Sequence, residues 1–229
     1  MKRKSILLAA CFSFIALVSC EGQKGGNVSM KTKTDSASYA LGINIGTNMK
    51  KDGLDSLNID ILAKAIRQVM KGDSLMMNPQ ESQACVQSYF SEKQKRKADV
   101  NLAAGKKFLD ENKSKPGVKV LPDGIQYIVE KDGTGPMPTT TDTVKVNYHG
   151  TRIDGTVFDS SVDRGEPAEF LLTRVIPGWV EVLQMMKVGS KWKIFIPAEQ
   201  AYGERGNGNR IEPNSVLIFD LELLSIKGK

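Results

Sequence analysis

The sequence predicts a two-part α+β protein, in which an all-helical segment precedes a twisted antiparallel sheet packed on one short helix. Three observations lead to this fold class. Apolar residues recur at helical spacing through residues 38–112, and they alternate with polar residues in several segments of 143–226. The second part also contains nine of the fifteen aromatic residues, including both tryptophans. We therefore place any chemistry in the second part.

The first of the predicted helices spans residues 38–51, where Leu41, Ile45 and Met49 are spaced four apart. Gly42 and Gly46 lie on the adjacent face, and a glycine pair in a helix indicates a close approach of a second helix. The next helix spans residues 60–71. Its inward side chains are predicted to be Leu62, Ile66, Val69 and Met70, and Gly72 ends it.

A third helix begins after Asn78, because a capping residue, a proline and then Glu81 form a strong start signal. It runs to about Asn112, and 34 residues at 1.5 Å each reach about 50 Å. Its start is apolar but its middle, residues 93–97, is basic. That run is interpreted as a solvated face, with anionic lipid or nucleic acid as the alternative partner. The helix is predicted to be a spacer arm.

These helices contain few large side chains for an independent core. We therefore predict that two copies pair through residues 35–92 to form a homodimer, with residues 35–117 as the helical dimerisation domain and spacer helix.

Residues 118–229 are predicted to form the second domain. The predicted strands are 143–148, 191–196 and 216–226, with Asp154-Gly155 as a hairpin turn. The one helix covers residues 177–187, with Val180, Leu183 and Met186 facing inward.

Composition excludes several classes of function. The chain has 229 residues, of which 40% are hydrophobic, so it can form one or two cores. Its net charge of +6 includes Lys2, Arg3 and Lys4, which leaves too mild a balance for nucleic acid as the main partner. Three cysteines and the single His149 exclude a zinc cluster, and no metal site is predicted.

The first twenty residues are predicted to be a signal peptide. A basic start precedes thirteen apolar residues, 6–18, which are too few to span a bilayer as a helix. The sequence from Leu17 to Cys20 resembles the lipobox of bacterial lipoproteins, which are cleaved before the cysteine and lipidated on it. The alternative is an ordinary signal cut nearby. We expect a lipid-anchored protein of the bacterial envelope, at the outer membrane and facing the periplasm, with residues 21–34 as a flexible tether.

Cysteine usage agrees with this expectation. Cys11 leaves with the signal and Cys20 is acylated, so only Cys85 remains. It is expected to be a small buried hydrophobe, with intermolecular pairing as the alternative.

The sequence lacks the motifs that covalent catalysis requires. There is no nucleophile elbow and no Walker loop, and the glycine-rich residues 203–208 lead to Pro213 and a strand rather than into a helix. His149 is the one candidate base, and it is predicted to be structural. The aromatic residues, a buried-looking Asp159 and a few donors favour apolar binding or a reaction without covalent chemistry.

In its second part the sequence resembles the FKBP-type peptidyl-prolyl cis-trans isomerases. The matching motifs, in order, are Tyr148-His149-Gly150, Asp154-Gly155, Phe158-Asp159-Ser160-Ser161, Arg164-Gly165, Val175 to Trp179, Met186 to Gly189, Ala201-Tyr202-Gly203 and Ile218 to Leu223. The resemblance covers residues 120–226, and residues 36–117 resemble the helical dimerisation segment of the Mip/FkpA-like members.

The resemblance implies a half-barrel sheet wrapped on one helix, with a prolyl pocket between them and no cofactor. Trp179 would form the pocket floor. The backbone N–H of Ile176 and the hydroxyl of Tyr202 would bind the carbonyls flanking the proline, and Asp159 would accept a polar contact at the mouth. The resemblance places these further residues in the site: Tyr148, Phe158, Phe219 and Val175 as walls, and Phe170, Ile211 and Arg164 as substrate-binding residues.

The implied function is to accelerate Xaa–Pro rotation in folding envelope proteins, with chaperone activity beside it. The alternative is a lipid-tethered chaperone or peptide-binding module with a weak or dead isomerase site. The chain departs from the family at Ala168, Asn207 and Arg210, all at the pocket rim. Macrolide inhibitors are therefore candidate ligands whose binding we expect to be weakened.

Overall fold

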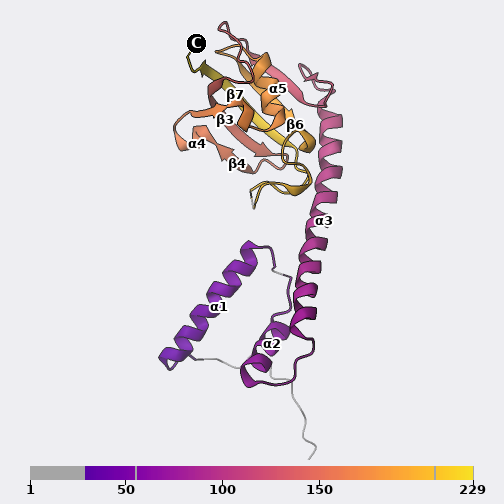
Figure 1. The fold of residues 1–229 in the computed structure, drawn as a ribbon, viewed down its shortest axis with the longest axis vertical. Coiled ribbons are helices and arrows are strands. Elements are labelled where there is room, and N and C mark those ends of the chain that lie inside the picture. Colours follow the sequence, from indigo (N-terminus) through magenta and orange to yellow (C-terminus); the bar gives the residue numbers. More distant parts are fainter. Residues whose placement is uncertain (1–28, 55, 209, 229) are drawn as a thin grey trace, which may run out of the picture. The chain divides into compact units, whose positions relative to one another are not determined.

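The computed structural model describes residues 29–54, 56–208 and 210–228 (Figure 1). The predicted signal peptide, its lipidation site at Cys20, and tether residues 21–28 lie outside the described residues. The chain divides into two compact units, Met1–Met76 and Met77–Lys229. The sequence places the start of the second domain at residue 118, whereas the second compact unit begins 41 residues earlier and includes the long helix.

The first unit contains helices α1 (Lys33–Lys51) and α2 (Ile59–Lys71). Helix α1 begins five residues before the predicted start, because Thr32 and Asp35 form a capping box there. Asn58 caps α2 at its start. Gly72 ends α2 in the left-handed conformation, with a φ of 73° that glycine adopts without strain.

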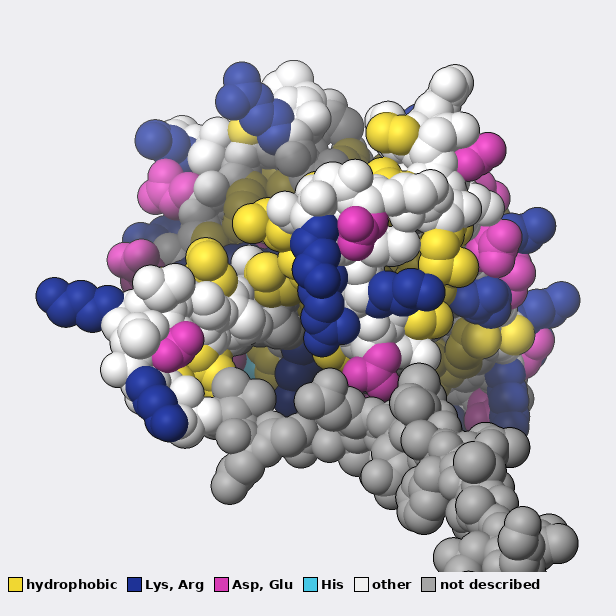
Figure 2. Space-filling view, turned by 90° about the horizontal axis from the view of Figure 1, so that it is seen from below, with side chains coloured by type: hydrophobic (Ala, Val, Ile, Leu, Met, Phe, Trp, Pro, Cys, Tyr) yellow, Lys and Arg dark blue, Asp and Glu magenta, His cyan; other side chains and the backbone are white. Residues whose placement is uncertain are grey.

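The apolar faces of these two helices are not covered within one chain. Neither helix has a buried residue, and Leu41, Ile61 and Val69 each expose more than 60% of their surface. No described atom lies where a Cβ on Gly42 or Gly46 would stand, so the close helix approach predicted from this pair does not occur in the single chain. In the space-filling view, hydrophobic side chains lie open between lysines and arginines (Figure 2).

Helix α3 (Pro79–Asn112) begins as predicted, with a complete capping box between Asn78 and Glu81. Cys85 on this helix is exposed rather than buried, which contradicts the expectation of a small core residue. No helix in the described ranges is long and apolar enough to span a membrane.

The second unit is built on one antiparallel sheet, which confirms the predicted α+β class. Its strands follow the order β1-β2-β6-β7-β3-β4, and β5 also pairs with β3. The strands are β1 (Lys119–Val120), β2 (Gln126–Lys131), β3 (Thr143–Arg152), β4 (Val157–Ser160), β5 (Ala168–Leu171), β6 (Lys191–Ile196) and β7 (Leu217–Ile226). The helical pieces are α4 (Ser161–Arg164), α5 (Pro177–Met185) and the short turns η1 (Leu172–Arg174), η2 (Ala198–Gln200) and η3 (Gly203–Arg205).

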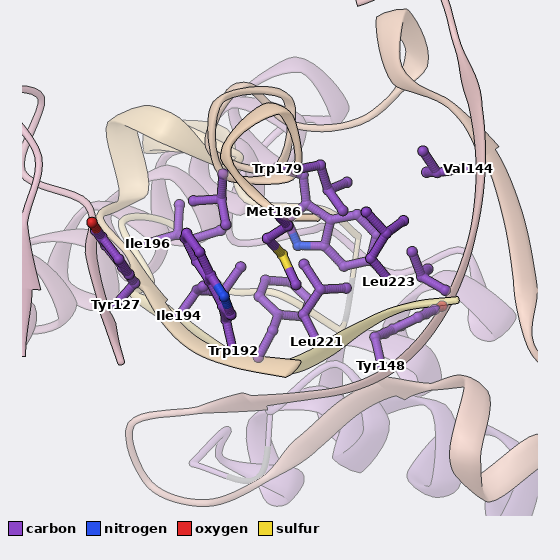
Figure 3. Close-up of a cluster of buried hydrophobic side chains, with 14 of the residues drawn as sticks. Tyr127, Val144, Tyr148, Trp179, Met186, Trp192, Ile194, Ile196, Leu221 and Leu223 are labelled. Carbon is purple, nitrogen blue, oxygen red and sulfur yellow. The ribbon is translucent and has the colours of Figure 1, made fainter. Parts of the chain in front are cut away.

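The core lies between α5 and the inner face of the sheet (Figure 3). The predicted alternation is confirmed in β3, β6 and β7, whose inward side chains are buried: Val144, Val146, Tyr148, Trp192, Ile194, Ile196, Leu217, Phe219, Leu221 and Leu223. Leu183 on α5 and Met186 directly after it are buried as predicted, but Val182 is fully buried and Val180 is only half-buried. The inner face of α5 is therefore set by Trp179 and Val182.

The C-terminal half of α3 packs on the outer face of the sheet. Phe108 contacts Phe195 on β6, with ring centroids 5.9 Å apart. The buried amide of Asn112 donates a hydrogen bond of 2.9 Å to Gln126 on β2. A Cβ on Gly105 would stand 2.7 Å from the side chain of Val216, so this close packing requires glycine. Helix α3 is thus fixed to the sheet along its second half.

A carboxyl group on α5, that of Glu181, lies beside the carboxylate of Asp123 in the β1–β2 turn. The pKa of Glu181 is raised because burial disfavours its charged form and because the carboxylate of Asp123, in the β1–β2 turn, lies beside it. A carboxyl group with a raised pKa in the folded state favours folding when it is protonated, and this contribution is lost as pH rises through that pKa.

We therefore expect Glu181→Gln to raise the melting temperature at pH 7 by about 1–2 °C, the shift expected for a surface interaction of about half a kcal/mol. At pH 3.5, where the wild-type carboxyl is already protonated, the difference should vanish. Thermal melts at both pH values check this, with the exposed Glu166→Gln as the matched control. A stabilisation that is equal at both pH values would contradict the proposed cause.

Candidate active site

A cleft of about 330 Å³ opens between α5 and the sheet. Strands β3, β4, β5 and β7 contribute its aromatic walls, and the segment from η1 into α5 forms a second side. The turn between η2 and η3 closes the third side. The residues that line it are Tyr148, Phe158, Asp159, Phe170, Arg174, Val175, Ile176, Pro177, Trp179, Ala201, Tyr202 and Phe219.

Trp179 is the centre of this arrangement. Its ring meets Tyr148, Phe170 and Phe219 edge to face, with centroids 5.3, 5.5 and 5.2 Å away. Such perpendicular contacts are the favourable geometry for aromatic rings. Trp179 itself is only 4% exposed, and Phe158 packs perpendicular to Phe219 above it. The cleft therefore has a rigid aromatic floor.

One polar cluster stands at the edge of the aromatic walls. The Tyr148 hydroxyl donates a 2.5 Å hydrogen bond to Asp159, and Arg164 donates to the other carboxylate oxygen. Arg164 also donates to the Tyr148 hydroxyl at 2.8 Å. These three side chains hold one another, so the Tyr148 ring is fixed both by packing and by hydrogen bonds.

The electrostatics follow from this cluster. Burial alone would raise the pKa of Asp159, but the hydrogen bonds from Tyr148 and Arg164 outweigh it and lower the pKa below the usual value. The pKa of the Tyr148 hydroxyl is raised, first by burial and then by its bond to the Asp159 carboxylate. At neutral pH the pair is therefore a phenol that donates to a carboxylate.

Nine of the eleven site residues predicted in this domain line the cleft. Arg164 lies beside it, bound to Asp159 and Tyr148. Ile211 was expected to bind substrate, but it is 4% exposed and packs in the core cluster, outside the lining. Its backbone pairs with that of Asn207.

Three lining residues were missed in the sequence: Arg174, Pro177 and Ala201. Pro177 and Ala201 stand inside motifs already singled out, so their neighbours indicated them. Arg174 has no such signal, because a charged residue before a turn is ordinary surface composition. It lies in the cleft because η1 brings the chain back over the aromatic walls.

Two further features bear on chemistry. Among the described residues, the backbone N–H of Ile176 has no protein acceptor, although Ile176 lines the cleft at the start of α5. His149 lies outside the lining, and its Nδ1 contacts both Ser160, at 3.0 Å, and Asp163, at 3.8 Å. One ring nitrogen cannot serve as both base and oriented donor, so this group does not form a catalytic triad.

Comparison with known proteins gives two matching family models. Residues 135–224 match the FKBP-type peptidyl-prolyl cis-trans isomerase domain, and residues 34–129 match the domain amino-terminal to it.

Individual relatives match over most of their length. The "Outer membrane protein MIP" of Legionella longbeachae is 44% identical, with 87% of this chain and 88% of the relative covered. The "FKBP-type 22 kDa peptidyl-prolyl cis-trans isomerase" of Escherichia coli is 42% identical, with 83% and 94% covered. The crystal structure of FkpA from Escherichia coli superposes with a TM-score of 0.68 at 37% identity, and the match covers 87% of this chain and 99% of that chain.

Proposed function

The chain belongs to the family of FKBP-type peptidyl-prolyl cis-trans isomerases, and from this premise we propose that the cleft above Trp179 is where it rotates Xaa–Pro bonds. The observation that carries this proposal is the aromatic lining, which gathers Trp179, Tyr148, Phe158, Phe170 and Phe219 around one opening. A prolyl ring is apolar and rigid, so it fits a shaped aromatic cleft better than other side chains do.

The chemistry requires no covalent step. An Xaa–Pro bond turns over slowly because twisting it breaks amide resonance, at a cost of about 18–20 kcal/mol. The twisted amide has lost its charge separation, so an apolar cleft favours it over the planar amide. A rate gain of about 10⁴–10⁵ requires only about 5.5–7 kcal/mol of such preference.

The lining residues take distinct roles in this proposal. Trp179 forms the floor under the prolyl ring, and the surrounding rings exclude water. The N–H of Ile176, which has no acceptor among the described residues, donates to a substrate carbonyl beside the proline. The Tyr202 hydroxyl donates to a second carbonyl. The Asp159–Arg164–Tyr148 cluster holds one wall in place.

Proline exchange in a short Xaa-Pro-Phe peptide, measured by NMR with residues 21–229, tests this assignment. We expect the protein to accelerate exchange and the Trp179→Ala variant to lose most of the acceleration. A folded protein that is inert in this assay but suppresses aggregation of an unfolded chain would favour the alternative, a chaperone or peptide-binding module.

We further propose that Arg174 gives the cleft a charge preference. The other charged lining residue, Asp159, is bound to Arg164, whereas Arg174 has no acidic partner among the described residues. The lining therefore carries one uncompensated positive charge.

A peptide with Glu before proline is expected to isomerise about three- to fivefold faster than one with Lys. An exposed charge pair contributes about 0.3–0.5 kcal/mol, which is attractive for Glu and repulsive for Lys, so the two peptides differ by about 0.6–1 kcal/mol. Arg174→Gln should abolish this ratio. Lys131→Gln removes the same charge outside the lining and should preserve it. The ratio of kcat/KM values for the two peptides is the measurement, and an unchanged ratio in Arg174→Gln would rule out the preference.

We propose that the first unit pairs two copies of the chain. Its apolar side chains are exposed on a single chain, and free exposure of so many large hydrophobes is unusual in a stable soluble unit. Two active clefts on one dimer would also hold an unfolded client at two points, which raises its effective affinity without new contacts.

Ile66→Glu with Val69→Glu places charges on the apolar face of α2 and is expected to convert the dimer to monomers. Lys64→Glu, on the opposite face of the same helix, should leave the dimer intact. Sedimentation equilibrium distinguishes the two states. A wild-type protein, residues 21–229, that sediments as a monomer at micromolar concentration would contradict the pairing.

The proposed location is the bacterial envelope, with proline-containing polypeptides in folding as clients. This proposal rests on the lipobox-like sequence before Cys20 and on the name of the Legionella relative, which is called an outer membrane protein.

A further inference from the structure

The loop between Tyr202 and Val216 joins the cleft to α3. Tyr202 lines the cleft at the start of this loop, and Val216 packs against Gly105 of α3 at its end. Gly203, Gly206 and Gly208 fall within it, all at positive φ. Glycine leaves the backbone free to move. The position of Tyr202 therefore depends on what fastens the rest of the loop.

Helix α3 provides the fastening. Lys97 forms an ion pair of 2.6 Å with Glu212. The amide of Asn101 donates to the Pro213 carbonyl at 2.9 Å and to the Glu212 carboxylate at 3.3 Å. Glu212 is also 3.8 Å from Arg152 on β3. These contacts bind the far end of the loop to a helix that is itself fixed to the sheet.

Asn214 connects this anchor to the cleft. Its side-chain amide donates to the Ala98 carbonyl on α3 at 3.2 Å, and its backbone N–H donates to the Gly203 carbonyl at 2.9 Å. Gly203 directly follows Tyr202. Asn214 is the one non-glycine residue in the described ranges with a positive φ, at 54°. Such a conformation costs free energy and persists where its surroundings hold it, often near functional sites.

We propose that Asn214 is a positioning residue, through which α3 holds Tyr202 at the edge of the cleft. Helix α3 is then part of the support of the active site as well as a spacer. This inference rests on the proposed role of Tyr202 in binding a substrate carbonyl.

The test is a double-mutant cycle in the protein that comprises residues 21–229. Asn214→Asp has nearly the same shape and also tolerates a positive φ, but its carboxylate cannot donate to Ala98. We expect it to lower kcat/KM for the Xaa-Pro-Phe peptide about three- to tenfold. In a Tyr202→Phe background it should have almost no further effect, because the group it positions is already gone. Asn214→Gly, which relieves the backbone strain, should behave in the same way.

Asn112→Ala is the matched control. It breaks another hydrogen bond from α3, to Gln126, at a distance from the loop. It should lower the melting temperature. Any loss of activity that it causes should be the same in the wild-type and Tyr202→Phe backgrounds. A spectroscopic readout stands beside the kinetics: the Tyr202 ring resonance in tyrosine-labelled protein should shift or broaden in Asn214→Asp and stay in place in Asn112→Ala.

The outcomes separate the two proposals. Equal losses with and without the Tyr202 hydroxyl, or a Tyr202 resonance unchanged in Asn214→Asp, would overturn the positioning role. A wild-type protein without isomerase activity would overturn the proposed function instead, and the resonance would still decide whether α3 holds Tyr202.

Discussion

Trp179→Ala is expected to lower kcat/KM for an Xaa-Pro-Phe peptide at least about tenfold, which corresponds to a loss of about 1.4 kcal/mol or more of transition-state preference. The physical reason is the position of Trp179 under the cleft, where three aromatic rings rest edge-on against it. Removing the indole opens the floor to water and lets Tyr148 and Phe219 collapse inward. A wet, misshapen cleft no longer favours the twisted amide.

The same substitution also removes a buried side chain, which costs about 3–5 kcal/mol of stability in a typical core. Trp192→Ala is therefore the matched control. Trp192 is similarly buried, at 6% exposed, but it stacks on Tyr127 and lies outside the cleft (Figure 3). Both variants should melt at lower temperature, and only Trp179→Ala should lose activity. Equal losses of activity would mean that the effect is one of general destabilisation.

Periodicity predicted the elements that decide the core. In β7, Leu217, Phe219, Leu221 and Leu223 are buried and alternate with half-buried residues that include Asp220 and Glu222, because one face of that strand packs on α5. The strand β2 was missed for the opposite reason. Its outward Gln126 is also buried, since α3 covers it, so the strand has no clean polar face. Alternation of apolar and polar residues indicates a strand with one exposed face, so it cannot indicate a strand that is covered on both faces.

The aromatic composition indicated an apolar site, but the individual site residues were expected from the family resemblance. No spacing along the chain brings Tyr148 beside Arg164, because strand pairing and the turn of α4 decide that contact. Ile211 is the predicted substrate-binding residue that packs in the core cluster and lies outside the cleft lining. Cys85 shows a limit of periodicity. Its position in a helical pattern predicted burial, but Cys85 is exposed in the single chain. Periodicity shows that a helix has an apolar face and does not show whether the same chain covers that face.

Asp159→Val is expected to lower kcat/KM about five- to tenfold, through the wall rather than the floor of the cleft. The carboxylate accepts from both Tyr148 and Arg164, and valine accepts from neither. The Tyr148 hydroxyl and the Arg164 guanidinium then lose their shared acceptor, and both side chains turn toward water to find another. The Tyr148 ring, which touches Trp179 edge-on, moves with its hydroxyl.

Asp220→Val is the matched control, because Asp220 is as exposed as Asp159 and also pairs with a cation, Lys193, but lies outside the cleft lining. It should leave kcat/KM unchanged.

Stability gives a second readout for Asp159. The lowered pKa of Asp159 means that its ionised form favours folding, a contribution present above its unfolded-state pKa and lost as pH falls through the folded-state value. The melting temperatures of wild type and Asp159→Asn should therefore differ at pH 7 and converge at low pH. If the difference between the two melting temperatures stays constant down to pH 2, the charge of Asp159 does not stabilise the cleft wall. The predicted loss of activity in Asp159→Val would then have no electrostatic cause.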